Sequence, residues 1–300
     1  REKLYATRSQ RTWPGRDDQV ITAWNGLMLR AMAEAARALD RADYQQTAVA
    51  TATFLTEHML AGGRLQRTWR GGPPRNGSAG SLRDTATLDG YLEDYAAVAN
   101  GLLSLYEDTG DVRWFSVARG LADDMLDRFW DDARNSFFDT AADHEVLIGR
   151  PRELTDNATP SGSSLAAEAL LRLAAFTGED RYRDTAVRVL LPLAAAMAEQ
   201  PSAFGHFLSA LDDLVGPLHE VAVVGASDDP AFQTLRHTLA SRYLPRTVLA
   251  YAPPNDGFAA AVPLLADRGL VDGRPAAYVC EGFVCRQPVT TPDALLTHLA

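Results

Sequence analysis

The chain has 300 residues but only two cysteines, Cys280 and Cys285. Two cysteines in a chain of this length do not make a disulfide framework, so we expect a reducing, cytoplasmic setting. Long apolar runs are missing as well. The longest one, from Val189 to Ala198, contains Pro192 and is far shorter than the roughly 20 residues that span a bilayer. The sequence therefore predicts no membrane span.

An excess of positive charge is also absent, since the formal net charge is -10. Binding to nucleic acid or to an anionic membrane needs clustered Lys and Arg, whereas the arginines here are scattered among acids. We expect neither partner. The first residues, Arg1-Glu2-Lys3, lead into a polar segment rather than the apolar stretch of a signal peptide. The absence of an initiating Met suggests a fragment or a processed product.

Several chemical fingerprints are missing too. The chain has no phosphate-binding loop, no nucleophile elbow and no dinucleotide-binding glycine pattern. Ser161, in Pro160-Ser161-Gly162, lacks the flanking glycine pattern of a nucleophile elbow and has no assignable base. The two cysteines have no paired histidines nearby and fall short of a four-ligand zinc site. We expect no metal and no cofactor.

What the chain does contain is a helical hairpin repeated three times. The second helix of each copy opens with a polar cluster and an aromatic residue, and an alanine follows the aromatic by four positions. The openings are Asp40-Arg41-Ala42-Asp43-Tyr44 with Ala48, Asp111-Val112-Arg113-Trp114 with Ala118, and Glu179-Asp180-Arg181-Tyr182 with Ala186. The repeat is about 70 residues long, which exceeds the common solenoid periods.

The first helix of each copy is headed by carboxylates, amides or aromatic residues. The heads are Asp17-Asp18 with Trp24-Asn25-Gly26, then Glu93-Asp94-Tyr95, then Asp156-Asn157 with Thr159-Pro160-Ser161-Gly162. If these helices pack side by side, their heads converge on one rim. The sequence therefore indicates where a site lies better than it indicates what the site does.

Capping and spacing signals predict where the helical elements begin. Residues 1–16 read as an extended lead-in, and Asp17 or Asp18 can cap the first helix. That helix carries Ile21, Trp24, Met28, Ala31 and Ala35 on one face. In the third copy Thr159 is the expected N-cap, with Pro160 at the first helical position. A fourth first-type helix at 204–215 has no second partner.

The two connections between copies are long. The first, from Ala61 to Leu88, is rich in Gly, Pro and Arg and exceeds the usual 2–8 residues of a helix connection, which marks it as a candidate functional loop. Strands are predicted within the connections at Leu65–Trp69 and Ser136–Thr140. Residues 1–217 are thus interpreted as one domain of helical hairpins.

After residue 217 the pattern changes. Strands are predicted at 221–225, 247–251 and 277–280, with a helix at Pro230–Tyr243 between the first two. We interpret residues 218–300 as a small α/β appendage that packs on the helical part. The fold class is mainly α, with a C-terminal α/β appendage.

These motifs carry a resemblance to a known family. Its segments are residues 16–28 (RDDQVITAWNGLM), Glu93-Asp94-Tyr95-Ala96, residues 156–162 (DNATPSG), and Tyr278-Val279-Cys280-Glu281 with Cys285. Over essentially its whole length the chain resembles the C-terminal part of YyaL-like proteins, also called spermatogenesis-associated thioredoxin-domain proteins.

The resemblance implies an N-terminal thioredoxin-like domain followed by an (α/α)6 barrel similar to six-hairpin glycosidases and N-acylglucosamine 2-epimerases. Neither the thioredoxin-like domain nor the early hairpins are found in this chain, which on this reading is the back half of a longer protein and a partial toroid. The missing domain is the protein partner that the resemblance implies. Such a likeness supplies an architecture more than a reaction.

The predicted rim has the ingredients of a carbohydrate site. Aromatic side chains stack on sugar rings. When two carboxyl groups differ in pKa, one can act as the general acid and the other as the general base. The candidate catalytic residues are Asp18, Glu93, Asp94 and Asp156, and the candidate substrate-binding residues are Trp24, Asn25, Tyr95, Asn157, Ser161 and His206. The reaction considered is sugar hydrolysis or isomerisation, with a small carbohydrate as the ligand.

Each of these residues also has a structural interpretation. Asp18 can be a helix cap, Glu93 and Asp94 suit a helix N-terminus, and Asp156-Asn157 can shape a turn. Trp24 and Tyr95 at helical spacing can belong to the core. Epimerases of the resembling fold use histidine as acid and base. Of the six histidines in this chain, only His206 is placed to face the rim. It can equally be a capped or surface residue.

Cys280 and Cys285 leave two interpretations open. They can be buried, inert thiols, or they can form a redox pair that exchanges with the missing thioredoxin-like domain. The second interpretation predicts Cα atoms about 4.4–6.8 Å apart and at least one accessible sulfur. The rival to a carbohydrate role is accordingly a redox-linked scaffold, and a structural module without activity is the third hypothesis.

Overall fold

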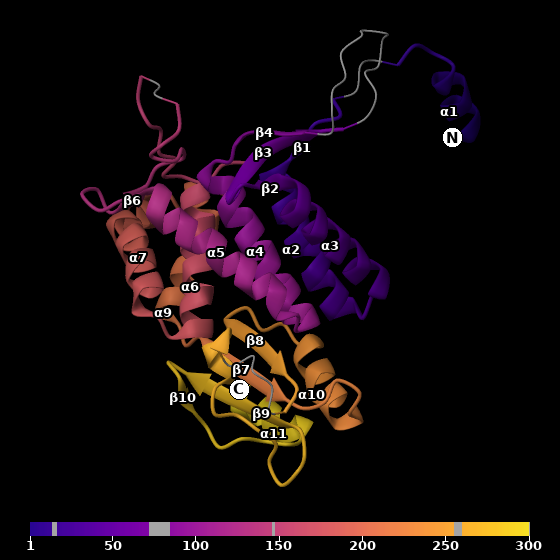
Figure 1. Ribbon diagram of the computed structural model, residues 1–300, viewed down its shortest axis with the longest axis vertical. Coiled ribbons are helices and arrows are strands. Elements are labelled where there is room, and N and C mark those ends of the chain that lie inside the picture. Colours follow the sequence, from indigo (N-terminus) through magenta and orange to yellow (C-terminus); the bar gives the residue numbers. More distant parts are fainter. Residues whose placement is uncertain (14–16, 72–84, 146–147, 255–259, 300) are drawn as a thin grey trace.

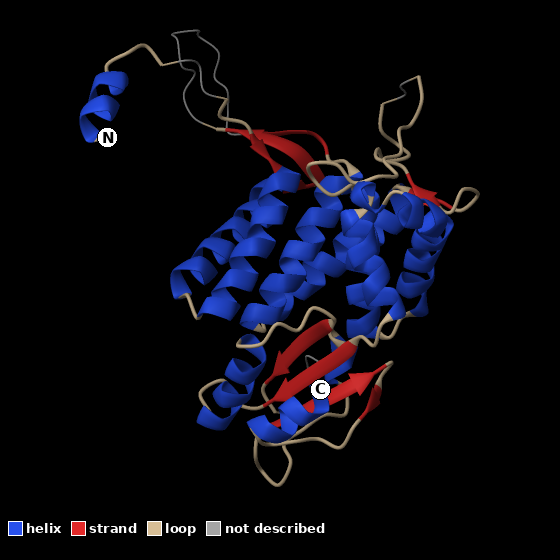
Figure 2. Cartoon of the chain, turned by 180° about the vertical axis from the view of Figure 1, so that it is seen from behind, coloured by secondary structure: helices blue, strands red, loops and turns tan. Residues whose placement is uncertain are grey.

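The structure is a computed structural model, and it describes residues 1–13, 17–71, 85–145, 148–254 and 260–299. A layer of paired helices makes up most of the molecule, and a mixed sheet with its own helices lies across one end of that layer (Figures 1 and 2). In the described residues no helix is both long and apolar enough to cross a membrane. The predicted fold class, mainly α with a C-terminal α/β appendage, is confirmed.

The helical layer is built from three hairpins and one further helix. The inner helices are α2 (Thr22–Leu39), α4 (Leu92–Thr109), α6 (Gly162–Thr177) and α9 (Gly205–Val215), and each packs against the next in that order. The outer helices are α3 (Ala42–Phe54), α5 (Val112–Arg128) and α7 (Asp180–Leu190), each behind the inner helix of its own hairpin. Ala48, Ala118 and Ala186 are fully buried, so the repeated alanine marks a packing position. This is the arrangement of a partial α/α toroid.

Two glycines allow α2 and α4 to approach closely. A Cβ atom added at Gly26 would lie 2.7 Å from backbone atoms of Ala97 and Val98, and one at Gly101 would lie 2.7 Å from the carbonyl oxygen of Gly26. Backbone atoms cannot move aside as a flexible side chain can, so a larger residue would force the helices apart.

Short strands cover the N-terminal ends of the first two inner helices. They are β1 (Val20–Ile21), β2 (Leu60–Ala61), β3 (Arg64–Arg70) and β4 (Thr85–Asp89), with β3 antiparallel to each of the others. The strand predicted at Leu65–Trp69 is present as β3. The strand predicted at Ser136–Thr140 is shorter, since β6 covers Ser136–Phe137, where it pairs with β5 (Trp130–Asp131). Of the long first connection, residues 72–84 lie outside the described residues.

The appendage is a four-stranded sheet in the order β10-β9-β7-β8. Its strands are β7 (His219–Val224), β8 (Thr247–Ala252), β9 (Ala276–Glu281) and β10 (Val284–Cys285), and only the β7–β8 pair is parallel. Ala222 and Ala250 belong to the core of the helical layer, whereas Val221 and Val223 pack with helices α10 (Pro230–Ala240) and α11 (Pro292–Leu299). One face of the sheet therefore rests on the toroid. The domain boundary at residue 217 stays a prediction.

Several predicted helix ends were wrong. Residues 1–16 are not all extended, because Glu2–Ser9 forms α1. The N-cap of α6 is Ser161, whose hydroxyl accepts from the Ser164 N–H, rather than Thr159. The outer helix of the third copy breaks at the 3-10 turn Leu191–Leu193, where Pro192 removes a donor, and resumes as α8 (Ala194–Glu199). A further 3-10 turn, Pro201–Ala203, precedes α9.

Candidate functional site

The head carboxylate of α4, Asp94, holds two helices and a strand together. Its side chain is fully buried and accepts the N–H groups of Ala23 on α2 and Tyr91, each at 2.8 Å. Arg67 on β3 donates to it at 3.0 Å. Burial raises the pKa of Asp94 to about 6, although Arg67 opposes the rise. With its oxygens occupied by these donors and its side chain inaccessible, Asp94 has a structural role here.

The head carboxylate of α6, Asp156, plays the same part between α6 and α9. One oxygen accepts from the Ser161 N–H and the Ser164 hydroxyl, at 3.0 and 2.6 Å. The other accepts from the N–H groups of His206 and Phe207, at 2.8 and 3.0 Å. These N–H groups belong to helix starts that have no intrahelical acceptor. Asp156 therefore joins the starts of two neighbouring inner helices.

The other predicted head residues do not converge on one pocket. Asp18 is exposed and is not the cap of α2, whose N-cap is Ile21. Glu93 is paired with Arg67 at 2.7 Å. Trp24 is 63% exposed, so the predicted apolar face of α2 is not its buried face, which instead carries residues such as Leu29 and Ala33.

Amide and aromatic head residues are also engaged locally. Asn25 donates to the Ile21 carbonyl, and Asn157, which is exposed, donates to Glu153. Tyr95 is only 2% exposed, and its hydroxyl accepts the Leu65 N–H. Ser161 is a fully buried cap. The structure therefore gives most heads a capping or packing role, which was the alternative interpretation of the sequence.

Polar side chains line the concave side of the inner helices instead. On each helix they recur three or four positions apart and so share one face. This polar inner face comprises Arg30, Glu34 and Arg37 on α2, Asn100, Ser104 and Glu107 on α4, Glu168 and Arg172 on α6, and His206, Ser209 and Asp213 on α9. All four helices contribute buried or half-buried charged side chains to it.

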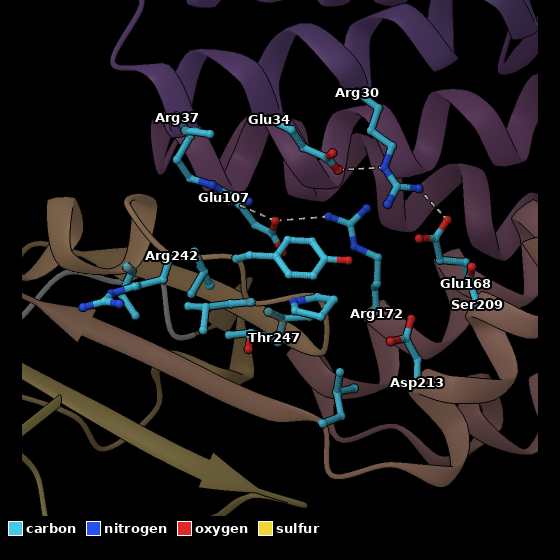
Figure 3. Close-up of a pocket in the computed structure, with 18 of the residues that line it drawn as sticks. Arg30, Glu34, Arg37, Glu107, Glu168, Arg172, Ser209, Asp213, Arg242 and Thr247 are labelled. Atoms are coloured by element: carbon cyan, nitrogen blue, oxygen red, sulfur yellow. Dashed lines mark hydrogen bonds and ion pairs between the residues drawn. The ribbon is translucent and has the colours of Figure 1, made fainter. Parts of the chain in front are cut away.

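Contacts within the polar inner face run from helix to helix. Arg37 and Arg172 meet the same oxygen of Glu107, at 3.1 and 3.3 Å. Arg172 also donates to the Ser104 hydroxyl at 3.2 Å, and that hydroxyl donates to Glu34 at 3.3 Å. Figure 3 shows Arg37, Glu107 and Arg172 reaching toward one another from separate helices. Ionic contacts thus tie together α2, α4 and α6.

Glu168 is the junction between this network and α9. Arg30 donates to it at 2.7 Å, and the Nε2 atom of His206 lies 3.0 Å from the same oxygen. Burial alone would raise the pKa of Glu168, but Arg30, His206 and Arg172 hold it well below its usual range. Glu168 is therefore ionised at neutral pH. His206 is the one predicted site residue whose side chain belongs to this network.

A cavity of about 710 Å³ lies between the polar inner face and the appendage. Its helical wall includes Glu168, Arg172 and Asp213, and its opposite wall includes Tyr243 and Thr247. Burial and the Glu168 carboxylate raise the pKa of Asp213 to about 6. In the described part of the chain no hydrogen bond to the Asp213 side chain is found. Glu168 and Asp213, two of the acids that line the cavity, therefore differ widely in pKa.

Glu168, Arg172 and Asp213 were missed because the sequence was read for helix heads. Their signal was present in the apolar helices themselves. Inside the run Leu165–Phe176, for example, Glu168 and Arg172 are the only charged residues and stand four positions apart. Charges are almost never fully buried unless they are paired, so their position in an otherwise apolar inner helix indicated a polar network.

The two cysteines form a disulfide, so their interpretation as inert thiols was wrong. Cys285 stands directly opposite Cys280 in the β9–β10 ladder, and their Cα atoms lie 3.8 Å apart, which is below the predicted range of about 4.4–6.8 Å. The redox interpretation had required a disulfide distance and an accessible sulfur, and Cys285 is exposed. Among the described residues no group of three or more His, Cys, Asp or Glu is placed to hold a metal ion.

Known proteins resemble the chain over nearly all of its length. No protein-family model matches it. It is 33% identical over 302 residues to human spermatogenesis-associated protein 20, which covers 98% of the chain and 38% of that relative. The mouse protein of the same name is 31% identical, and the uncharacterized protein B0495.5 of Caenorhabditis elegans is 26% identical over 290 residues.

Solved structures give weaker matches. A family 76 mannosidase of Bacteroides thetaiotaomicron has 16% identity and a TM-score of 0.45, over 59% of this chain and 44% of that one. A family 76 α-mannanase of the same organism has 14% identity and a TM-score of 0.48, over 77% and 58%. A cellobiose 2-epimerase of Bacillus thermoamylovorans has 13% identity and a TM-score of 0.46, over 59% and 45%.

The match to spermatogenesis-associated protein 20 covers 98% of the chain, but the chain spans less than two fifths of that protein's length. The chain is therefore homologous to one part of spermatogenesis-associated protein 20.

Proposed function

We propose that the chain binds a small carbohydrate in the cavity between the polar inner face and the appendage, and acts on it by acid–base chemistry. One observation carries the proposal: the cavity wall holds an ionised carboxylate, Glu168, beside a carboxyl group, Asp213, whose pKa is raised to about 6. A general acid and a general base can be two carboxyl groups when their environments give them different pKa values.

The remaining wall residues suit a sugar. Arg172 and Glu107 offer donors and acceptors to hydroxyl groups, and Tyr243, which is 90% exposed, offers an aromatic ring at the appendage side. Positive and negative side chains alternate across the wall, which favours a neutral polyhydroxy ligand over a strongly charged one.

In this arrangement Asp213 donates a proton to a sugar oxygen and Glu168 stabilises the positive charge that develops on the ring. His206 and Arg30 position Glu168, because both contact its carboxylate. The reaction class is sugar hydrolysis or isomerisation.

The proposed partner of the chain is another domain of the longer protein. A thioredoxin-like domain outside the chain, implied by the family resemblance, would accompany the carbohydrate site in a cytoplasmic protein. The chain's own residues supply the cavity walls described above.

A thermal-shift screen of the 300-residue chain against mono- and disaccharides tests the proposal. A ligand at one hundred times its dissociation constant stabilises the fold by about 2.7 kcal/mol. We expect at least one sugar to raise the melting temperature of the wild type and of Glu93→Gln, and to leave Asp213→Asn unshifted.

Glu93→Gln is the matched control, because it removes one carboxylate from the helix heads rather than from the cavity. A screen in which no sugar shifts the wild type would contradict the proposal. The proposal would also be contradicted if the sugar-induced rise in melting temperature were lost in Glu93→Gln and kept in Asp213→Asn. That result would place the site at the helix heads.

A further inference from the structure

The disulfide lies at the edge of the appendage sheet. Cys280 on β9 is 1% exposed, whereas Cys285 on the two-residue edge strand β10 is exposed. The strands are joined by Gly282 and Phe283, both with positive φ, which is the two-residue turn of a tight hairpin. Cys285 is therefore the more accessible of the two half-cystines, and Cys280 is covered.

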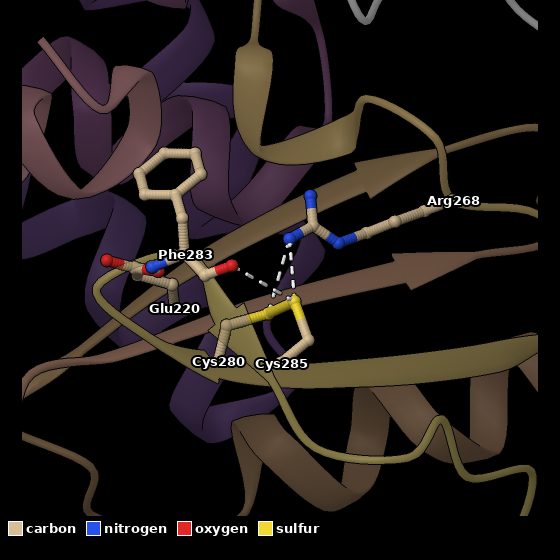
Figure 4. The surroundings of a disulfide bond; sticks show 5 residues. All are labelled: Glu220, Arg268, Cys280, Phe283 and Cys285. Carbon is tan, nitrogen blue, oxygen red and sulfur yellow. Dashed lines mark hydrogen bonds between the residues drawn. A yellow bond between two sulfur atoms is a disulfide. The ribbon is translucent and has the colours of Figure 1, made fainter.

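Arg268 contacts both sulfur atoms. Its Nη2 lies 3.2 Å from Sγ of Cys280 and 3.0 Å from Sγ of Cys285. Figure 4 shows the guanidinium group extended toward the disulfide. A cation at this distance stabilises a thiolate far more than it stabilises a neutral disulfide.

The guanidinium group is short of other partners. Its Nε is buried without a hydrogen bond, and burial lowers the pKa of Arg268 while Glu220 opposes the change. Within the described residues no carboxylate forms an ion pair with it, and Glu220 instead accepts the Phe283 N–H at 2.7 Å. A half-buried cation without a counterion costs stability, and a thiolate produced by reduction would supply the counterion.

We propose that Cys280–Cys285 is a thiol–disulfide exchange site, with Cys285 the sulfur that is attacked and Arg268 the residue that stabilises the reduced form. It lies outside the carbohydrate cavity, since none of these three residues lines that cavity. The proposal therefore does not depend on the function of the cavity.

The exchange partner is a dithiol. One thiolate of the partner attacks Sγ of Cys285, the disulfide bond breaks, and Cys280 leaves as a thiolate beside Arg268. The partner's second thiolate then attacks its own bound sulfur and releases Cys285. The partner is oxidised to a cyclic disulfide, and two electrons reduce the protein's disulfide to two thiols.

The test is the fraction of reduced chain in dithiothreitol buffers of graded reduced-to-oxidised ratio. After acid quenching, alkylation with a heavy maleimide counts free thiols, and the chain has only these two cysteines. We expect Arg268→Gln to require about a tenfold more reducing ratio for half-reduction, since one charge-assisted hydrogen bond to the thiolate is lost. Arg268→Lys, which keeps the charge, is expected to fall between the wild type and Arg268→Gln.

Arg286→Gln is the matched control. It removes the same charge next to Cys285, but Arg286 is exposed and pairs with Glu281 at 3.5 Å. We expect it to change the required ratio less than threefold, roughly the effect of a screened surface charge. An equal shift in the two Gln variants, or none in either, would overturn the role of Arg268.

Single-cysteine variants test which sulfur is attacked. With oxidised dithiothreitol replaced by a small aromatic disulfide, Cys280→Ser should form a mixed disulfide at Cys285 faster than Cys285→Ser does at Cys280. The opposite order would overturn the assignment. Melting curves identify any variant that is unfolded, and for such a variant Arg268→Lys and the rate comparison still decide the question.

Discussion

Carboxylates occur both at the heads of the inner helices and midway along them, and the two groups do different things. Asp94 and Asp156 at the heads accept hydrogen bonds from the starts of two helices each. Asp213 on the polar inner face accepts none in the described part of the chain, although its pKa is raised to about 6, as that of Asp94 is. A raised pKa alone therefore does not mark a functional carboxyl group; the number of donors around it separates the two cases.

The difference has a thermodynamic consequence. A buried carboxylate that caps helices offsets part of the cost of burial through the hydrogen bonds that it accepts. A half-buried carboxylate without donors costs stability whenever it is ionised. Natural proteins retain such groups where function needs them.

The largest effect is expected for Asp94→Asn. The new amide N–H₂ would face the Tyr91 N–H or the Ala23 N–H, and Arg67 would lose its buried partner. Breaking a buried ion pair and a cap together should lower the free energy of unfolding by about 3 kcal/mol. Urea unfolding at pH 7 measures it. A loss below the error of the method would show that Asp94 is not structural.

Asp156→Ala should cause the next largest loss of stability. It removes the shared acceptor of α6 and α9, leaving the N–H groups of His206 and Phe207 without it. We expect a loss of about 2 kcal/mol in the same unfolding measurement. The neighbouring exposed residue provides the control, because Asn157→Ala removes one contact with Glu153. Equal losses in the two variants would remove the special role of Asp156.

Asp213→Asn should change the free energy of unfolding in the opposite direction, towards greater stability. The folded-state pKa of Asp213, about 6, lies above the 3.8 of an unperturbed Asp, so the folded state binds the proton more tightly. Stability is therefore lost as pH rises from about 4 to 6. At pH 7 the variant should be about 1 kcal/mol more stable than the wild type, after allowance for partial exposure, and near pH 4 the two should be equal.

The smallest effect is expected for Trp24→Ala. The side chain is 63% exposed, so truncation should change the free energy of unfolding by less than about 0.5 kcal/mol. Sugar binding in the thermal-shift screen should also be unchanged, since Trp24 does not line the cavity. Lost binding would support the original prediction that Trp24 is a stacking platform.

The hairpin repeat could be predicted from sequence because each copy repeats one local pattern. Tyr44, Trp114 and Tyr182 open the outer helices at equivalent positions, and the alanine four residues later is buried each time. Such periodicity is a local property and survives folding unchanged. The helix starts were less predictable, as Thr159 and Ser161 show, because neighbouring residues compete for the same cap.

The site could not be predicted in the same way. Asp94 precedes an apolar run whether it caps two helices or faces a ligand, and only the tertiary donors Ala23 and Arg67 distinguish the cases. The cavity depends on how the appendage meets the inner helices, so Tyr243 and Asp213, 30 positions apart in sequence, become opposite walls only in the fold. Cys280 and Cys285 were singled out correctly as a pair, but Arg268, which gives the pair its chemistry, has no sequence signal.

The most direct test makes one chemical change at two sites. Asp94→Asn and Asp213→Asn each replace a carboxyl group, with a pKa raised to about 6, by its neutral isostere. We predict that their free energies of unfolding at pH 7 change in opposite directions, with Asp94→Asn destabilising and Asp213→Asn stabilising. A destabilising Asp213→Asn would contradict the account, because Asp213 would then be a structural residue like the head carboxylates.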